Sequence, residues 1–325
     1  MDIEWIVKMF QEGRIEKKAF WKLMREKYLP LLEYQKLLQG NEFCKEIKIC
    51  KNIVTLNVEG VNLCFDFTQT ISRAESMLSM GGDYEQEDLA FLAAHIQHGD
   101  VVFDIGGNVG FFSLALMQQC HGAESYVFEP LPSTYEKMQR NINLNQEVAK
   151  RIHAFQLGFG AESGELTFYL PGTDQAASMR PLEDEFYLEE SDAQGKYTGR
   201  AKLDKVICKV ETLDNFCREN AILRMDVLKC DVEGAERDVL LGGEESLIQW
   251  KPLVYCEMLR KHAKRFGYHP NDIIHYMANL GYSCFTFRDH NLVPFYSMDE
   301  NTKESNYFFF HQEKHAKMIH SIDRT

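Results

Sequence analysis

One run of the chain, VVFDIGGNVGFFSLAL, has the residue types and spacing of a ligand-binding turn. Asp104 ends an apolar strand, Gly106, Gly107 and Gly110 follow it, and an apolar helix begins near Phe111. Glycines are required where a ligand lies against the backbone at a strand-to-helix turn. An acid at the end of this strand would repel a pyrophosphate, but it suits a ligand that carries an ammonium and a sulfonium. The turn therefore favours S-adenosylmethionine.

The spacing of the glycines disfavours a nicotinamide cofactor. Counted from Gly106, the G-x-G-x-x-G fingerprint requires glycine at positions 108 and 111, where this chain has Asn108 and Phe111. An NAD(P)-dependent oxidoreductase is therefore a weaker alternative. A plain glycine turn without a ligand leaves the acid and the three glycines unexplained.

Glu129 closes the next apolar run, SYVFEP. An acid at this place in a nucleotide-binding α/β fold can accept hydrogen bonds from both ribose hydroxyls, although a surface acid at a strand end is the alternative. Asn141, Asn143 and Asn145 end the following helix, where asparagine is a common cap, so we expect a structural role for them.

A second motif, VLKCDVEGAERDVLLGG, repeats the pattern of an apolar strand that ends in an acid. Asp231 lies at the predicted carboxyl end of a central strand, where open α/β sheets bind their ligands. Glu233 and Glu236 follow at a helix start, and the helix dipole alone favours acids there, so Glu236 needs no catalytic role. Lys229 lies on the same face as Asp231 and is either its ion partner or a cap for a neighbour.

Glu257 in LVYCEM and the nearby His262 close a further strand, and both are candidate general bases. Asp231, Glu233 and Glu257 could instead hold a divalent cation that orients a diol, because Mg²⁺ prefers oxygen ligands. The nine cysteines are odd in number and scattered, and no C-x-x-C pair occurs, so we expect free thiols, a reducing compartment and no zinc site.

The composition excludes several classes of protein. The 325 residues carry a net charge of −13, which disfavours a nucleic-acid partner, because such partners are bound mainly through Lys and Arg. The start, MDIEWIVKMFQEG, lacks the basic and apolar regions of a signal peptide, and no run approaches a membrane span. We therefore expect a cytoplasmic protein with no membrane span.

The elements that must position these residues form a doubly wound α/β sheet. Short apolar runs alternate with helical stretches, which predicts a parallel sheet covered on both faces: VVFDIG, SYVFEP, RIHAFQL, DVLKCDV and PLVYCEM. The runs YSCFTF and NYFFFH predict an antiparallel pair at the sheet edge. Helices with breaks at Gly13 and Pro30 and a hairpin around Glu59-Gly60 precede the sheet.

These strings resemble the FkbM-type family of S-adenosylmethionine-dependent methyltransferases. The resemblance runs from about Asp83 to Glu257, and it is most specific in the D-x-G-x-N-x-G turn and in LKCDVEGAERDVLLGG. It implies a class I methyltransferase (Rossmann-like) fold and, most often, O-methylation of a hydroxyl on a sugar, polyketide or other secondary metabolite. Some relatives are linked to N-methylation of peptide amides.

The resemblance also implies roles for individual residues. The implied cofactor is S-adenosylmethionine, and its product is S-adenosylhomocysteine. The residues assigned to binding it are Tyr84, Glu85, Asp104, Gly106, Gly107, Asn108, Gly110, Glu129, Pro130, Gly158 and Asp231. Those assigned to catalysis are Asp231, Glu233, Glu257 and His262. Two departures stand out: Gly107 replaces the usual alanine, and LGFGAESG lacks a carboxylate for the adenine amino group, so adenine recognition through backbone groups is expected.

We expect three parts: an accessory region over 1–82, a methyltransferase domain over 83–312 and a tail over 313–325. Residues 171–205 form an acidic insertion that is either a solvated segment or a lid over the site. Substrate choice is expected to reside in the first 80 residues and in this insertion. The exposed apolar residues of the N-terminal helices would support a homodimer. A catalytically silent binding module is the remaining alternative, which the three acids at strand ends disfavour.

Overall fold

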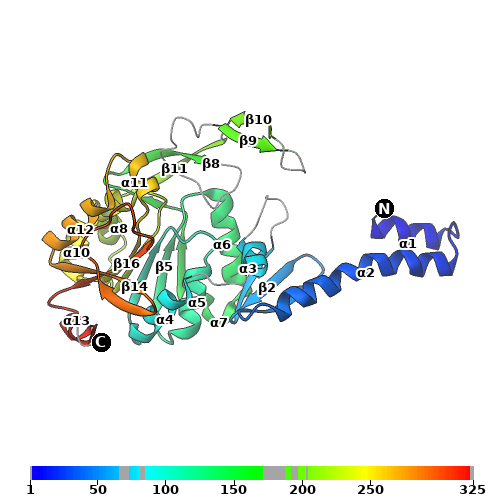
Figure 1. Cartoon of the computed structure of the whole chain (residues 1–325), viewed down its shortest axis with the longest axis horizontal. Helices are drawn as coiled ribbons and strands as arrows, with labels where there is room; N and C mark the ends of the chain where they lie inside the picture. Colours follow the sequence, from blue (N-terminus) through cyan, green and yellow to red (C-terminus); the bar gives the residue numbers. More distant parts are fainter. Residues whose placement is uncertain are drawn as a thin grey trace.

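The computed structural model describes residues 2–65, 73–80, 85–170, 187–191, 197–202 and 204–322. Figure 1 shows a body built around a twisted sheet and a helical arm that extends from it. Tyr84 and most of the predicted acidic insertion lie outside the described residues.

An eight-stranded sheet forms the centre of the body, in the order β15-β14-β16-β13-β12-β4-β5-β6. The strands β13, β12, β4, β5 and β6 run parallel, and β16 is antiparallel to both of its neighbours. This confirms the predicted doubly wound sheet with an antiparallel edge, which is the class I methyltransferase arrangement. The bounds are β4 (Val101–Ile105), β5 (Glu124–Phe128), β6 (Ile152–Phe155), β12 (Val227–Cys230), β13 (Leu253–Glu257), β14 (Tyr282–Arg288), β15 (Asn291–Pro294) and β16 (Asn306–His311).

Helices cover both faces of the sheet, which is why its strands are apolar throughout. Neighbouring residues of β4 show the alternation: Val102 packs into one buried cluster and Phe103 into the other. The first cluster includes α4 (Gln86–His95), α5 (Phe111–Gln119), α6 (Pro132–Leu144) and α7 (Gln146–Ala149). The second includes α8 (Leu213–Glu219), α9 (Glu236–Leu241), α10 (Glu244–Trp250), α11 (Arg260–Arg265) and α12 (Pro270–Asn279).

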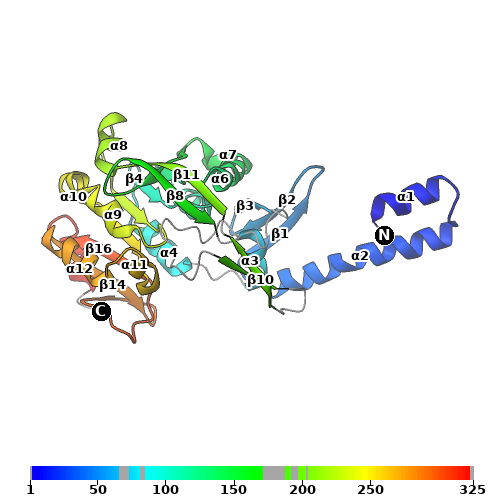
Figure 2. The ribbon, with the colours of Figure 1, turned by 90° about the horizontal axis from the view of Figure 1, so that it is seen from above.

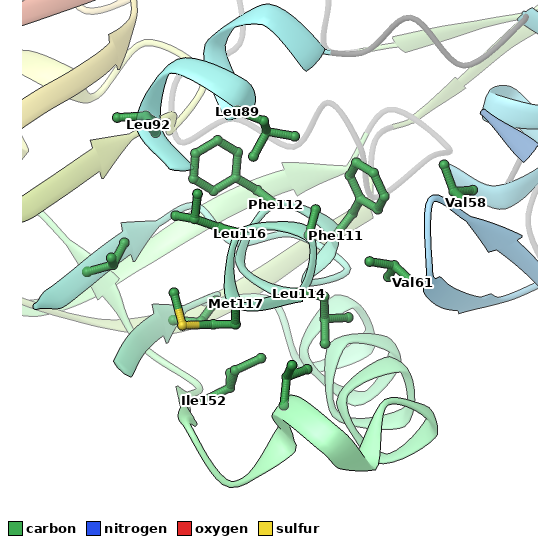
Figure 3. Packing of buried hydrophobic residues seen from close by; sticks show 14 of the residues in the cluster. Val58, Val61, Leu89, Leu92, Phe111, Phe112, Leu114, Leu116, Met117 and Ile152 are labelled. Atoms are coloured by element: carbon green, nitrogen blue, oxygen red, sulfur yellow. The ribbon is translucent and has the colours of Figure 1, made fainter. Parts of the chain in front are cut away.

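Helix α5, which follows the glycine turn, is buried on all sides over residues 111–117. Figure 3 shows why: Leu89 and Leu92 of α4 lie on one side of it, and Val58 and Val61 of the N-terminal hairpin lie on another. The glycine turn is therefore fixed at the start of a helix that packs on every side.

The predicted hairpin around Glu59-Gly60 is present and belongs to the same core as the sheet. Strands β2 (Val54–Val58) and β3 (Val61–Cys64) pair antiparallel, and a further strand, β1 (Cys44–Ile49), joins β2. Asn141 and Asn145 of the α6 end tie this hairpin to the body, because their side-chain oxygens accept the backbone N–H groups of Cys64 and Asn62.

The N-terminal arm consists of α1 (Ile3–Gln11) and α2 (Lys17–Gln39), and α3 (Arg73–Met80) follows the hairpin. The predicted break near Gly13 is confirmed, but the predicted break at Pro30 is wrong, because α2 continues through it. Proline removes one helical hydrogen bond, and the leucine- and lysine-rich sequence on both sides continues the helix. Figures 1 and 2 both show α2 extending away from the body with α1 beside it.

A small sheet, β7-β11-β8, lies beyond β6 in the chain. It comprises β7 (Gly158–Phe159), β8 (Gly164–Leu170) and β11 (Asp204–Glu211), and a separate antiparallel pair is formed by β9 (Tyr187–Ser191) and β10 (Tyr197–Lys202). These last strands belong to the stretch predicted as an insertion, whose role as a lid stays a prediction.

The described part of the chain ends in α13 (Ala316–Ile322) and contains no helix long and apolar enough to cross a membrane. All nine cysteines are free thiols, and Cys230 and Cys256 are buried, as their apolar surroundings in the sequence predict.

Candidate functional site

A cavity of about 300 Å³ opens at the carboxyl ends of the central strands β4, β5, β12 and β13. This is the edge at which open α/β sheets bind their ligands. The residues that line the cavity are Arg73, Ile105, Gly106, Gly107, Asn108, Val109, Phe111, Phe112, Glu129, Pro130, Leu131, Leu157, Gly158, Phe159, Phe168, Lys229, Asp231, Val232, Glu233 and Glu257.

The loop after β4 can be built only with glycine at its first two positions. Gly106 has a φ of +84°, and a Cβ there would lie 1.7 Å from the carbonyl oxygen of Asp231. A Cβ on Gly107 would lie 2.2 Å from Cγ1 of Val127, so alanine at this position would require the buried Val127 side chain to shift. Glycine at position 107, where the resemblance leads us to expect alanine, therefore agrees with the close packing of Val127 in this chain.

Glu129 is buried at the end of β5 and is held by the backbone of two loops. Its Oε2 accepts the N–H of Asn108 at 3.1 Å, and its Oε1 accepts the N–H of Leu131 at 3.0 Å. Asn108 has a φ of +50°, a left-handed conformation that asparagine tolerates better than most residues. Glu129 lines the cavity, so its carboxylate lies within the site that a ligand would occupy.

Asp104 lies behind the cavity wall. It is fully buried, accepts the hydroxyl hydrogen of Ser113 at 2.7 Å and pairs with the ammonium of Lys229 at 3.0 Å. Lys229 also lies 3.6 Å from Asp231 and donates to the carbonyl of Gly106 at 3.2 Å. The predicted ion pair with Asp231 is present, but the shorter pair is with Asp104, and the bond to Gly106 shows that Lys229 also caps a neighbouring loop. This lysine joins the β4 and β12 loops beneath the cavity.

The loop after β12 is braced by Glu236. Its Oε1 accepts the N–H groups of Val232 and Gly234 at 3.1 and 2.9 Å, and its Oε2 accepts the hydroxyl of Tyr268 at 3.1 Å. Gly234 has a φ of +112°, and a Cβ there would lie 2.7 Å from the carbonyl oxygen of His262. Glu236 is buried and its hydrogen bonds shape the loop, in line with the structural interpretation of this residue.

Glu233 lines the cavity, and its Oε2 lies 3.1 Å from Nδ1 of His262, which is buried behind it. Burial, and then the charges of Asp231 and Glu236, raise the pKa of Glu233 to about 7. A carboxyl group with a pKa near neutrality can exchange a proton with a ligand at physiological pH.

Two more acids face this group. Burial, then the neighbouring Asp231 and Glu233, raise the pKa of Glu257 to about 9. Burial also raises the pKa of Glu85 to about 7, although Lys229 opposes the shift. Among the residues that the structure describes, none hydrogen-bonds Oε2 of Glu85. Acids outnumber cations around the cavity, which therefore favours a cationic ligand.

Most of the residues assigned from the sequence line this cavity: Gly106, Gly107, Asn108, Glu129, Pro130, Gly158, Asp231, Glu233 and Glu257. Four others do not, namely Glu85, Asp104, Gly110 and His262. The described residues contain no group of three or more His, Cys, Asp or Glu side chains that could hold a metal ion.

Sequence reasoning missed Arg73 and most of the apolar wall. Arg73 is the first residue of α3, and nothing in the sequence around it resembles a motif. Phe111 and Phe112 directly follow the glycine turn, so their position could have identified them as wall residues.

Comparison with known proteins gives one family and several relatives. A family model described as the methyltransferase FkbM domain matches residues 104–284. Methyltransferase sdnD of Sordaria araneosa is 30% identical over 171 residues, which are 49% of this chain and 66% of the relative. The 31-O-demethyl-FK506 methyltransferase FkbM of Streptomyces tacrolimicus is 30% identical over 167 residues, which are 46% of this chain and 62% of the relative.

The chain thus spans less than two thirds of the length of these curated relatives. Among solved structures, methyltransferase FkbM from Methylobacillus flagellatus is similar with a TM-score of 0.43 and 12% identity, covering 87% of this chain and 59% of that one.

Proposed function

The chain belongs to the methyltransferase FkbM domain family, whose model covers more than half of it, and on that premise we propose that it is an S-adenosylmethionine-dependent O-methyltransferase. The acceptor is a hydroxyl on a sugar, polyketide or other secondary metabolite. One observation carries the proposal: a single cavity joins the glycine turn, the buried Glu129 and the acids Asp231, Glu233 and Glu257.

The residues present fit the methyl donor. A nucleoside ligand needs a close backbone approach and a carboxylate for its hydroxyls, which Gly106 and Glu129 offer side by side. An apolar wall of Leu157, Phe159 and Phe168 suits a planar base. Asp231, at the β12 end, suits an ammonium and a sulfonium. Tyr84, outside the described residues, is assigned to the same site only by the resemblance.

When bound, the donor supplies a methyl carbon already activated by its sulfonium. The protein then has to align the acceptor oxygen with that carbon, and such positioning is worth several kcal/mol. Lys229 contributes by fixing Asp231 relative to Gly106, so that both loops present one rigid surface. Asp231 is assigned to the orientation of donor and acceptor on this surface.

Glu233 is the proposed general base. An aliphatic hydroxyl attacks poorly until it loses its proton, so a base within hydrogen-bond reach is required. Glu233 lies in the cavity wall, has a pKa near 7 and is oriented by His262. His262 lies behind Glu233, and its proposed role is to position that carboxylate. Glu257, with a pKa raised to about 9, holds its proton at neutral pH and is available as a hydrogen-bond donor to the acceptor.

The choice of a hydroxyl acceptor is supported by the Streptomyces relative, whose name describes methylation at an oxygen. A panel of sugar, polyketide and peptide acceptors with a labelled methyl donor tests this choice. We expect label in hydroxyl-bearing acceptors, and transfer only to peptide nitrogen would contradict the O-methylation.

Calorimetric titration with S-adenosylhomocysteine tests the cofactor. We expect the compound to bind to the wild-type protein and not to Glu129→Ala. The substitution removes the carboxylate that contacts the glycine turn from the end of β5. Glu124→Ala is the matched control, since Glu124 lies at the other end of β5 and is exposed. A well-folded wild-type protein that does not bind the compound would contradict the proposal.

A further inference from the structure

The second half of α2 carries apolar side chains that the body does not cover. Six residues between positions 28 and 37, which we call the bare segment, are 43% to 53% exposed: Tyr28, Leu29, Leu31, Leu32, Tyr34 and Leu37. The first half of the same helix is different, because α1 packs on it. Phe10 stacks on Phe20 with ring centroids 4.4 Å apart, and Ile6 and Met24 are buried there.

Apolar side chains occur all around the bare segment, with the polar residues Glu33, Gln35 and Lys36 between them. At about 100° per residue, its six apolar side chains leave no gap wider than roughly 80° around the helix axis. Six large apolar side chains exposed along ten residues form a patch that another molecule normally covers. A lipid surface would cover only one side of the helix and leave the other side in water, so this distribution favours a protein partner over a membrane.

The charge of the chain favours a second copy as that partner. Helix α2 carries six Lys or Arg residues and two Glu, whereas the whole chain has a net charge of −13. The arm of one copy is therefore attracted to the acidic body of another. Figures 1 and 2 show the arm extending well clear of its own body, so the arm is accessible to a second molecule.

We propose that the chain forms a two-fold dimer in which the bare segments of two α2 helices cross and pack on each other. A two-fold axis uses the same surface on both copies, which suits one self-complementary apolar segment. An antiparallel crossing directs the basic first half of each α2 toward the body of the partner copy. Trp5 of α1 and Trp21 of α2, both exposed, then face the body of the partner copy.

Light scattering coupled to gel filtration on the full chain tests the dimer. We expect a mass of twice 37.7 kDa for the wild type and a monomer for Leu31→Glu combined with Leu32→Glu. Leu223→Glu is the matched control, because Leu223 is 88% exposed on the body, and it should remain dimeric. A monomeric wild type at tens of micromolar overturns the proposal.

A second measurement keeps the test valid if the double variant does not fold. Equal amounts of ¹⁴N- and ¹⁵N-labelled chain are mixed and treated with a lysine-reactive cross-linker. We expect mixed-isotope links between Lys27 and Lys36, which flank the bare segment. A dimer without arm links overturns the proposed interface. A monomer that sediments with vesicles of phosphatidylcholine and phosphatidylglycerol overturns it in favour of a lipid surface.

Discussion

The loops after β4 and β12 occupy equivalent places on neighbouring parallel strands, but they present opposite chemistry to the cavity. The β4 loop, residues 106–110, presents backbone, because Gly106 and Gly107 have no room for side chains. The β12 loop, residues 231–236, presents carboxyl groups, and Glu236 braces it from within. Both loops contain left-handed residues, among them Asn108 and Glu233.

The difference indicates that the two loops have different roles within one site, ligand recognition for the β4 loop and proton transfer for the β12 loop. A backbone surface recognises a ligand by shape and cannot exchange protons, whereas raised carboxyl pKa values suit proton transfer. The two loops are nevertheless coupled, because Lys229 contacts Gly106, Asp104 and Asp231. Changes in the β12 loop should therefore affect turnover first, and changes in the β4 loop should affect binding and stability first.

The largest effect is expected from Glu233→Gln. Loss of the proposed base should lower turnover by about 10²- to 10⁴-fold while the affinity for S-adenosylhomocysteine stays within about twofold. Turnover of the wild type should rise as pH increases through about 7, where Glu233 ionises, and the variant should lose this limb. Glu245→Gln, an exposed change on α10, is the control. A pH profile that is the same in wild type and Glu233→Gln would remove this residue from proton transfer.

His262→Gln sharpens the same result. It should shift the pH limb and reduce turnover less than Glu233→Gln does, because His262 acts only through the carboxylate. An unchanged limb with reduced stability would leave His262 with a purely structural role.

The next effect is expected from Gly106→Ala. The added methyl would meet the carbonyl oxygen of Asp231, so both loops must separate. We expect a loss of about 3 kcal/mol in the free energy of unfolding, measured by urea denaturation, together with weaker cofactor binding. Gly164→Ala is the control, since no atom lies within 4 Å of the Cβ position there. Equal stability of the two variants would contradict the close contact of the loops.

A smaller effect is expected from Arg73→Gln. Arg73 lines the cavity, and because a guanidinium can hold a carboxylate through two parallel hydrogen bonds, we expect Arg73 to contact the carboxylate of the bound nucleoside. Its loss should weaken S-adenosylhomocysteine binding by about 30-fold, or about 2 kcal/mol, and leave 5′-methylthioadenosine, which lacks the carboxylate, unaffected. If the affinity for both nucleosides is unchanged but the KM of an acidic acceptor rises, the carboxylate belongs to the acceptor. Equal weakening of both nucleosides would contradict carboxylate binding.

The sequence predicted the central sheet and the positions of the cavity acids, because each strand is a local apolar run that ends in the acid concerned. It could not predict the direction of Asp104. The parallel register places Asp104 opposite Lys229, more than a hundred residues away, and their ion pair directs the acid away from the cavity. The sequence also did not identify Arg73 as a cavity residue, because only the fold brings α3 to the sheet edge.

The predicted helix break at Pro30 was wrong for a different reason. A proline in the interior of a helix costs about 3 kcal/mol, so the sequence alone predicts a break. The bare segment, which contains Pro30, exposes six large apolar side chains, and the proposed packing of two arms would offset this cost. The error at Pro30 and the dimer proposal therefore concern the same stretch of chain.

The last effect is gradual, about 1 kcal/mol for each pH unit, and concerns the pH dependence of stability. Burial raises the pKa of Glu257 from its ordinary 4.5 to about 9 in the folded chain, so between these values the folded state binds a proton that the unfolded state has lost. Stability is therefore highest below about 4.5 for this group and falls as pH rises toward 9, by about 1 kcal/mol per pH unit. In Glu257→Gln this slope should disappear, so that urea denaturation at pH 6, 7 and 8 shows wild type and variant converging at low pH and the variant more stable at high pH. Parallel curves would mean that neither burial nor the neighbouring acids raise the pKa of Glu257 in the folded chain, and the proposed proton-holding role of this residue in the acidic loop region would be wrong.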